Sequence, residues 1–200
     1  MERARARGRP RGFDRDEALG RAVQVFWRRG YQDASVSALA EAMGIGSASL
    51  YAAFSSKAAL FREAADRYQS LDAARPDREL EEGATARASV EGWLRANVDL
   101  FTRRGGPRGC LLTRAASSCP HDEPDVRRYL DASCRDRVTA VERRLRRAAD
   151  AGESLPASPP ELARLLDTVL QGLAVRAIEG ASRPSLQATI DLALATWLPP

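Results

Sequence analysis

The sequence predicts an all-α protein, and three observations lead to this fold class. Apolar residues recur every three or four positions along most of the chain, which is the spacing of one helix face. Glycines and prolines divide this pattern into about nine segments of helical length. No stretch alternates apolar and polar residues with β-branched enrichment, so we expect no strand.

The N-terminal part of the chain is expected to hold a basic arm and three helices. Residues 1–12 mix arginine with glycine and proline, a composition typical of a disordered arm. A first helix is expected over residues 14–29, because an acidic capping box opens it and apolar residues follow at helical spacing. Two shorter helices, over residues 36–43 and 47–54, flank a tight turn at Gly44.

The remainder of the chain is expected to form a second helical domain. A helix over residues 57–74 is expected to link the N-terminal domain, residues 13–56, to the C-terminal domain, residues 57–200. The charged stretch 75–83 contains a proline and is expected to be a connection. Five more predicted helices cover residues 85–103, 109–120, 123–151, 161–179 and 185–197.

Positive charge is concentrated at the N-terminal end. The net charge is +4, and residues 1–30 hold nine arginines against four acidic residues, a formal charge of +5. A basic end is typical of a protein that meets phosphate. A solvated basic tail, or an arm that binds a membrane surface, would have the same composition, and DNA retention as against liposome binding would separate these alternatives.

Several classes of protein are excluded by residue type and spacing. His121 is the only histidine and lies two residues after Cys119, a spacing that rarely gives nucleophile–base geometry. With Cys110 and Cys134 the spacing matches no zinc pattern, and three cysteines are expected as free thiols. We therefore expect no enzyme, no bound metal and no cofactor. No apolar run is long enough to span a bilayer and the N-terminus is polar, so we expect a cytoplasmic protein with no membrane partner.

The most informative block is residues 34–61, ASVSALAEAMGIGSASLYAAFSSKAALF. Two short predicted helices flank the Gly44-Ile45-Gly46 turn, which is the layout of a helix-turn-helix whose second helix enters the major groove of DNA. The small Ala40 would allow the two helices to approach closely. Leu39 and Leu50 are expected in the small core that holds them at a fixed angle.

This block resembles the DNA-binding domain of the tetracycline-repressor (TetR) family, and the resemblance extends over about residues 13–68. The matching elements are Val36, Leu39-Ala40, Gly44-Ile45, Leu50-Tyr51, Phe54, Ser56-Lys57 and Leu60-Phe61. The resemblance implies a homodimeric transcription regulator that binds a palindromic, double-stranded operator. It also implies a small-molecule effector that releases the DNA, with repression as the usual mode.

The resemblance also assigns roles to individual positions. Groove or phosphate contacts are implied for Ser47, Ala48, Ser49 and Tyr51, and phosphate contacts for Ser35, Ser37 and Lys57. The third helix departs from the family pattern, since it offers no arginine or asparagine for bidentate base readout. The arm resembles an AT-hook core, so Arg7, Arg9 and Arg11 are expected in an A·T minor groove, with an idle tail as the alternative.

The last two predicted helices are expected to form the dimer interface. The family resemblance implies a four-helix bundle between two copies, and the wide leucine stripe of residues 161–179 agrees with it. An ordinary core helix would show a similar stripe. The predicted interface residues are Leu166, Val169, Leu173, Ile190, Leu194 and Trp197.

An effector pocket is expected between the helices of the C-terminal domain. Its predicted lining is Trp93, Val98, Phe101, Cys110, Leu112, Tyr129 and Leu170, with plain core packing as the alternative for each. Few buried charges are expected there, which favours a largely apolar ligand. The thiol of Cys110 leaves a second interpretation open, an electrophile or oxidant as the effector, against a small buried hydrophobe.

Overall fold

The computed structural model describes residues 13–195, and this part of the chain forms ten α-helices and no strand. The all-α prediction is therefore confirmed. The predicted sites Arg7, Arg9, Arg11 and Trp197 lie outside the described residues. The helices are α1 (Arg15–Arg29), α2 (Val36–Met43), α3 (Ser47–Phe54), α4 (Lys57–Leu71), α5 (Ala74–Glu82), α6 (Ala86–Phe101), α7 (Leu111–Ser118), α8 (Pro124–Asp150), α9 (Pro159–Ile178) and α10 (Arg183–Ala195).

Short polar residues start the helices of the N-terminal domain. The side chain of Asp14 accepts hydrogen bonds from the backbone at the start of α1, while Ser35 and Ser56 cap α2 and α4 in the same way. Gly44 ends α2 in the left-handed conformation, at φ 71°, which a glycine adopts without strain. These local choices set the angle between α2 and α3, as a helix-turn-helix requires.

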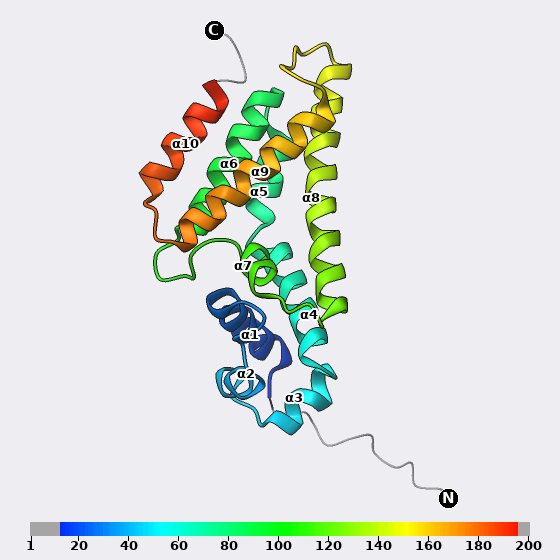
Figure 1. Ribbon diagram of the computed structural model, residues 1–200, viewed down its shortest axis with the longest axis vertical. Helices are drawn as coiled ribbons and strands as arrows, with labels where there is room; N and C mark the ends of the chain where they lie inside the picture. Colours follow the sequence, from blue (N-terminus) through cyan, green and yellow to red (C-terminus); the bar gives the residue numbers. More distant parts are fainter. Residues whose placement is uncertain (1–12, 196–200) are drawn as a thin grey trace, which may run out of the picture.

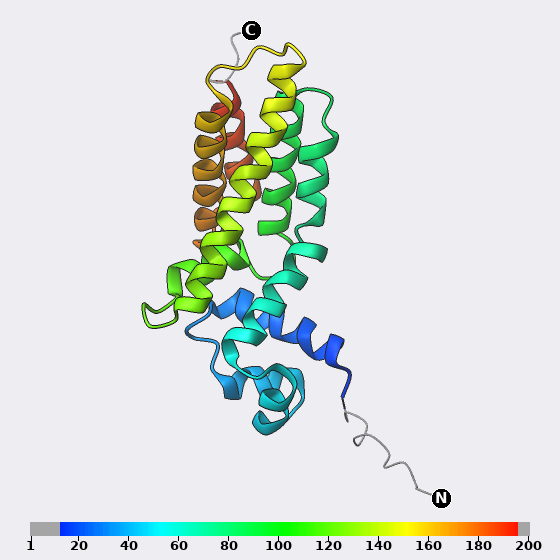
Figure 2. The ribbon, with the colours of Figure 1, turned by 90° about the vertical axis from the view of Figure 1, so that its right-hand side faces the viewer.

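The two domains lie at opposite ends of the molecule. Figure 1 shows α1, α2 and α3 at one end, and α5, α6, α8, α9 and α10 gathered along the rest of the long axis. Figure 2 shows α4 rising from α3 towards the C-terminal bundle, so this helix belongs to both halves. The short helix α7 packs against α1, which places the middle of the chain at the junction.

The sequence patterns do not predict helix α5. They indicate a connection over residues 75–83, but the structure has a helix over Ala74–Glu82. Pro76 lies in the first turn of α5, where a backbone N–H has no intrahelical partner, so proline is tolerated there. Leu80 and Pro76 are buried, and α6 is the helix against which α5 packs most extensively. This extra helix makes ten helices where the sequence predicts nine.

Helix α6 forms the centre of the C-terminal domain. It packs against α5, α9 and α10, and its apolar side chains Trp93, Leu94 and Val98 are fully or almost fully buried. The longest helix, α8, lies beside α9 and reaches down to α4. None of the described helices combines the length and the hydrophobicity needed to cross a membrane.

Candidate DNA-binding surface and ligand pocket

Helix α3 divides its side chains cleanly between core and surface. Leu50 and Phe54 are buried against the neighbouring helices. Ser47, Ala48 and Ser49 are exposed, and 48% of the surface of Tyr51 is open. All four residues predicted to face DNA are therefore exposed, and Figure 1 places their helix, α3, at the free end of the domain.

The two serines that open α2 are also exposed. The hydroxyl of Ser35 accepts a hydrogen bond from the backbone N–H of Ala38, and it lies 3.0 Å from the hydroxyl of Ser37. This pair stands at the N-terminus of α2, where backbone N–H groups have no intrahelical partner. The start of α2 thus presents hydroxyl and amide donors of the kind that phosphate accepts.

Lys57, which is predicted to contact phosphate, makes two contacts within the protein. Its Nζ donates a 3.1 Å hydrogen bond to the carbonyl of Gln32 and lies 4.4 Å from the centre of the Tyr31 ring. Burial lowers the pKa of this amine, and nearby carboxylates, that of Glu123 first, oppose the change. The lysine thus ties α4 to the loop before α2, because that loop offers an acceptor and an aromatic face within its reach.

The helix-turn-helix carries little positive charge of its own. Between residues 30 and 61 the sequence has one basic side chain, Lys57, and two acidic ones, Asp33 and Glu41. The lysine is engaged as described above, so no free cation of this segment accompanies the exposed face of α3. The five arginines of residues 1–12 precede this domain in the chain.

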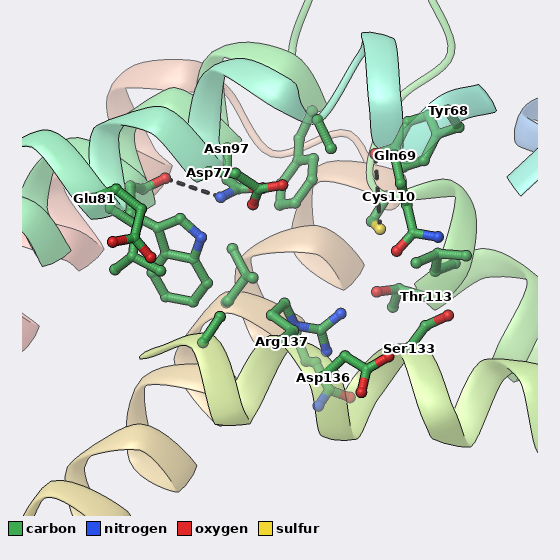
Figure 3. A pocket seen from close by; sticks show the side chains of 18 of the residues that line it. Tyr68, Gln69, Asp77, Glu81, Asn97, Cys110, Thr113, Ser133, Asp136 and Arg137 are labelled. Atoms are coloured by element: carbon green, nitrogen blue, oxygen red, sulfur yellow. Dashed lines mark hydrogen bonds between the residues drawn. The ribbon is translucent and has the colours of Figure 1, made fainter. Parts of the chain in front are cut away.

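A cavity of about 360 Å³ lies within the C-terminal domain, and helices α4 to α9 all contribute to its lining. Such a volume is in the range of small-molecule sites. Five of the residues predicted from the sequence do line it: Trp93, Phe101, Cys110, Leu112 and Leu170. Figure 3 shows the cavity, with Cys110 labelled in its wall. Tyr68 and Leu80 extend the apolar part of the wall, and the sequence patterns do not predict them there.

Two predicted pocket residues are placed elsewhere. Val98 is fully buried in the core and does not line the cavity. The hydroxyl of Tyr129 donates to Asp66 Oδ1 at 2.6 Å and accepts from Gln69 Nε2 at 2.9 Å. Burial and the Asp66 carboxylate together raise the pKa of this phenol well above its ordinary value. Tyr129 therefore holds Gln69, which lines the cavity, instead of lining it directly.

Charged side chains also line the cavity, but four of them are exposed and Arg137 is half-buried, so they do not contradict the prediction of few buried charges. They are Asp77, Glu81, Asp136, Arg137 and Arg143. These come from the polar faces of α5 and α8, whose charges the sequence shows but whose orientation it does not. Arg137 donates to Asp167 at 2.6 Å, and Arg143 pairs with Glu81 at 2.9 Å.

The cavity is connected to the N-terminal domain through two aromatic side chains. The hydroxyl of Tyr68, in the cavity wall, donates to the sulfur of Cys110 at 3.8 Å. The Tyr68 ring packs edge-on against Trp27 of α1, with 4.7 Å between the ring centres. Trp27 in turn donates a hydrogen bond to the carbonyl of Gly109, the residue before Cys110. A molecule that displaces Tyr68 would therefore act on α1 directly.

The predicted dimer residues lie mainly inside the protomer. Leu166, Leu173, Ile190 and Leu194 are buried in its own core, and Val169 is half-buried. The large apolar side chains that α9 and α10 leave exposed are different ones: Leu165, Val175 and Leu192. The leucine stripe thus packs within one chain, and the outward face of both helices is the side open to a partner.

Two family profiles match this chain in succession. The profile of bacterial regulatory proteins of the tetR family matches residues 18–64, and the tetracyclin repressor-like C-terminal domain matches residues 86–190. The first match covers the helix-turn-helix together with most of α1 and the first half of α4. The second match begins at α6 and extends into α10, so it includes most of the helices that line the cavity.

Whole-chain relatives agree with these matches. The HTH-type transcriptional repressor ComR of Escherichia coli (strain K12) is 32% identical over 199 residues, 96% of this chain and 93% of that protein. The HTH-type transcriptional repressor BdcR of the same organism is 27% identical over 193 residues, 96% and 93% of the two chains. A cysteine mutant of the TetR family transcriptional regulator CifR, complexed with 26bp double-strand operator DNA, superposes with a TM-score of 0.89 at 42% identity, over 96% of this chain and 100% of that one. The chain described here therefore belongs to the tetR family of bacterial regulatory proteins, which are transcription regulators and not enzymes.

Proposed function

We propose that this protein is a homodimeric repressor that binds a palindromic operator and releases it when a small molecule fills the cavity. The observation that carries the proposal is the exposed face of α3, where Ser47, Ser49 and Tyr51 stand free while Leu50 and Phe54 anchor the helix. A hydroxyl-rich helix held rigidly by its other face is suited to enter a major groove. The operator complex of CifR and the repressor names of ComR and BdcR support the same role.

The N-terminal arm is proposed to supply most of the electrostatic attraction to DNA. The helix-turn-helix offers no unengaged lysine or arginine, whereas the arm carries Arg7, Arg9 and Arg11 in an Arg-Gly-Arg-Pro-Arg run. Arginines inserted in a narrow A·T minor groove meet a concentrated negative potential. Operator affinity would then depend on the arm, while the exposed side chains of α3 and the start of α2 position the protein on the site.

The dimer is proposed to form through the outward face of α9 and α10. Leu165, Val175 and Leu192 stand exposed there. A Cβ placed on Gly172 of α9 would have nothing within 4 Å, so the surface is open at this point and would allow close helix approach. A two-fold pairing presents two copies of α3 to successive turns of one DNA face. A regulator of this kind acts in the cytoplasm, where bacterial DNA lies.

A second kind of effector is favoured by one contact. The thiol of Cys110 lines the cavity and receives the hydroxyl of Tyr68, the residue that also packs on Trp27. An electrophile or oxidant that modifies this sulfur would disturb the same junction as a bound ligand. Substitution of Cys110 by Ser separates the two mechanisms, because only the response to electrophiles depends on the thiol.

Selection from a random pool of double-stranded DNA tests the proposed function. The fragments that the purified full chain retains are expected to contain an inverted repeat with half-sites about 10 base pairs apart. Substitution of Tyr51 by Ala is expected to weaken retention without changing the free energy of unfolding, whereas the matched Leu71→Ala, on exposed α4 surface, leaves retention unchanged. An enriched sequence without two-fold symmetry, or retention by liposomes but not by DNA, would refute the proposal.

A further inference from the structure

Only some of the charged side chains around the cavity have an ion-pair partner. Both guanidinium groups are paired, Arg137 with Asp167 and Arg143 with Glu81, and Glu81 also pairs with Arg147. By contrast, Asp77 and Asp136 are exposed at the same cavity, and their carboxylates have no hydrogen bond or ion pair among the described residues. The unneutralised charge of the cavity is therefore negative.

A second acceptor on the cavity wall belongs to a buried residue. Asn97 is only 7% exposed, and its Nδ2 donates a 2.9 Å hydrogen bond to the carbonyl of Trp93. This leaves the side-chain carbonyl of Asn97 without a donor among the described residues. Asn97 of α6 and Asp77 of α5 both line the cavity (Figure 3), and these two helices pack against each other, so both acceptors come from the α5–α6 corner of the cavity.

Two aromatic rings flank this corner. Trp93, Asn97 and Phe101 follow one another at intervals of four residues, so they share one face of α6, and all three line the cavity. Trp93 and Phe101 are each 1% exposed, which keeps water from most of their surface. Carboxylate and amide acceptors close to aromatic rings form an environment that favours a cation.

The electrostatics of Asp77 agree with a missing counter-charge. Burial raises the pKa of this carboxyl above its ordinary value, Arg137 opposes the change, and the neighbouring Glu81 adds to it. The side chain of Asp77 is exposed and has no ion pair among the described residues, so a cation placed at this corner would supply the counter-charge, whereas an anion would meet two unpaired carboxylates.

We propose that the effector is an apolar or aromatic molecule that carries a protonated amine, with the nitrogen held by Asp77 and Asn97. Its body would lie against Trp93, Phe101 and Leu170. This inference rests on the proposed function, since it takes the cavity to be the effector site. It replaces a purely apolar ligand by an amphipathic one, and it excludes carboxylates and phosphates of similar shape.

Matched compounds that differ only in the polar group test the proposal. Two series are suitable, 2-phenylethylamine with 2-phenylethanol and 3-phenylpropionate, and tryptamine with tryptophol and indole-3-propionate. Binding to the full chain without DNA is measured by calorimetry and by thermal shift. The amines are expected to bind about tenfold or more tightly than the alcohols, and the carboxylates more weakly still.

Substitutions in the protein test where the nitrogen of the ligand amine binds. Asp77→Asn keeps the shape of the side chain and is expected to lower amine affinity about tenfold while leaving alcohol affinity unchanged. The control is Asp150→Asn, an exposed carboxyl at the end of α8. Equal or better binding of the carboxylates, amine affinity that does not change in Asp77→Asn, or no amine binding at millimolar concentration would each overturn the proposal.

Failure of the amine proposal can be distinguished from failure of the proposed function. Operator retention is measured on the same preparation in the absence of any compound, and it tests DNA binding alone. Amines that bind and depend on Asp77 but never release operator would contradict the proposed effector role of the cavity while confirming the ligand class. If only neutral or anionic molecules release the operator, the proposed regulation is supported and the proposal of an amine effector is refuted.

Discussion

The indole Nε1 of Trp27 donates a 2.7 Å hydrogen bond to the carbonyl oxygen of Gly109, across the boundary between the two domains. Trp27 is fully buried on α1, and Gly109 ends the loop that leads to Cys110 in the cavity wall. One side chain of the DNA-binding domain is thus fixed to the edge of the ligand pocket. The position of α1 and the state of the cavity cannot change independently without breaking this bond.

Replacing Trp27 by Phe is expected to destabilise the protein by about 2–4 kcal/mol, because a cavity forms and the Gly109 carbonyl loses its donor. Urea unfolding measures this change, and hydrogen exchange should quicken in residues 105–110. Arg21→Gln, which removes an exposed ion pair with Glu17 on the same helix, is the control and should cost well under about 1 kcal/mol. Equal stabilities of the two variants would contradict the role given to the hydrogen bond.

Gly109 and Gly105 form a matched pair in the loop between α6 and α7. Both have positive φ, 77° and 73°, but a Cβ at Gly109 would meet Ile178 Cγ1 at 2.3 Å and the Ala174 carbonyl at 2.8 Å, whereas nothing lies within 4 Å of one at Gly105. Gly105→Ala is expected to cost about 1 kcal/mol from its backbone alone. Gly109→Ala should cost about 1–3 kcal/mol more, because backbone must move. Similar thermal unfolding of both variants would argue against tight packing here.

The proposed dimer can be tested with two well-exposed leucines. Leu192 of α10 is 72% exposed and Leu71 of α4 is 60% exposed. Leu192→Arg is expected to shift the protein towards monomer, because a charge placed in an apolar interface is desolvated without a partner. Leu71→Arg should leave the dimer intact. Sedimentation equilibrium at several concentrations gives both masses, and dimers of equal affinity in the two variants would exclude this face.

Salt dependence tests the arm. Replacing Arg7, Arg9 and Arg11 by Ser is expected to weaken operator binding and to flatten the plot of log affinity against log salt by about 0.9 per lost phosphate contact. The Lys triple variant preserves the charge, so its slope should stay near the parent value while its preference for A·T-rich flanks falls. Fluorescence anisotropy over a range of salt concentrations measures both. An unchanged slope in the Ser variant would leave the arm without a role on DNA.

Local patterns in the sequence are sufficient for the N-terminal domain. The acidic cap at Asp14 and the turn at Gly44 are set by neighbouring residues, and each is where the sequence places it. The α5 helix escapes prediction because Pro76 suggests a break, and only the start of the helix two residues earlier makes that proline acceptable. Its position depends on packing against α6, which no local pattern encodes.

The other differences between prediction and structure concern the orientation of side chains. The periodicity of α9 identifies apolar faces, but it cannot say that Leu166 and Leu173 meet their own core while Leu165 stays outside. The inward turn of Arg137 depends on Asp167, 30 residues away in sequence. Lys57 is expected to contact phosphate, and the structure adds a hydrogen bond from its amine to the carbonyl of Gln32. These contacts join segments far apart in the chain, so spacing alone does not predict them.

The double contact of Tyr68, with Cys110 on one side and Trp27 on the other, also limits how this regulator can be redesigned as a biosensor. Mutations intended to admit a new inducer belong at other residues that line the cavity, such as Leu80 and Trp93, which take no part in the contacts of Tyr68 with Cys110 and Trp27. Libraries that randomise Tyr68 would instead yield variants that are permanently on or permanently off, whatever compound is supplied.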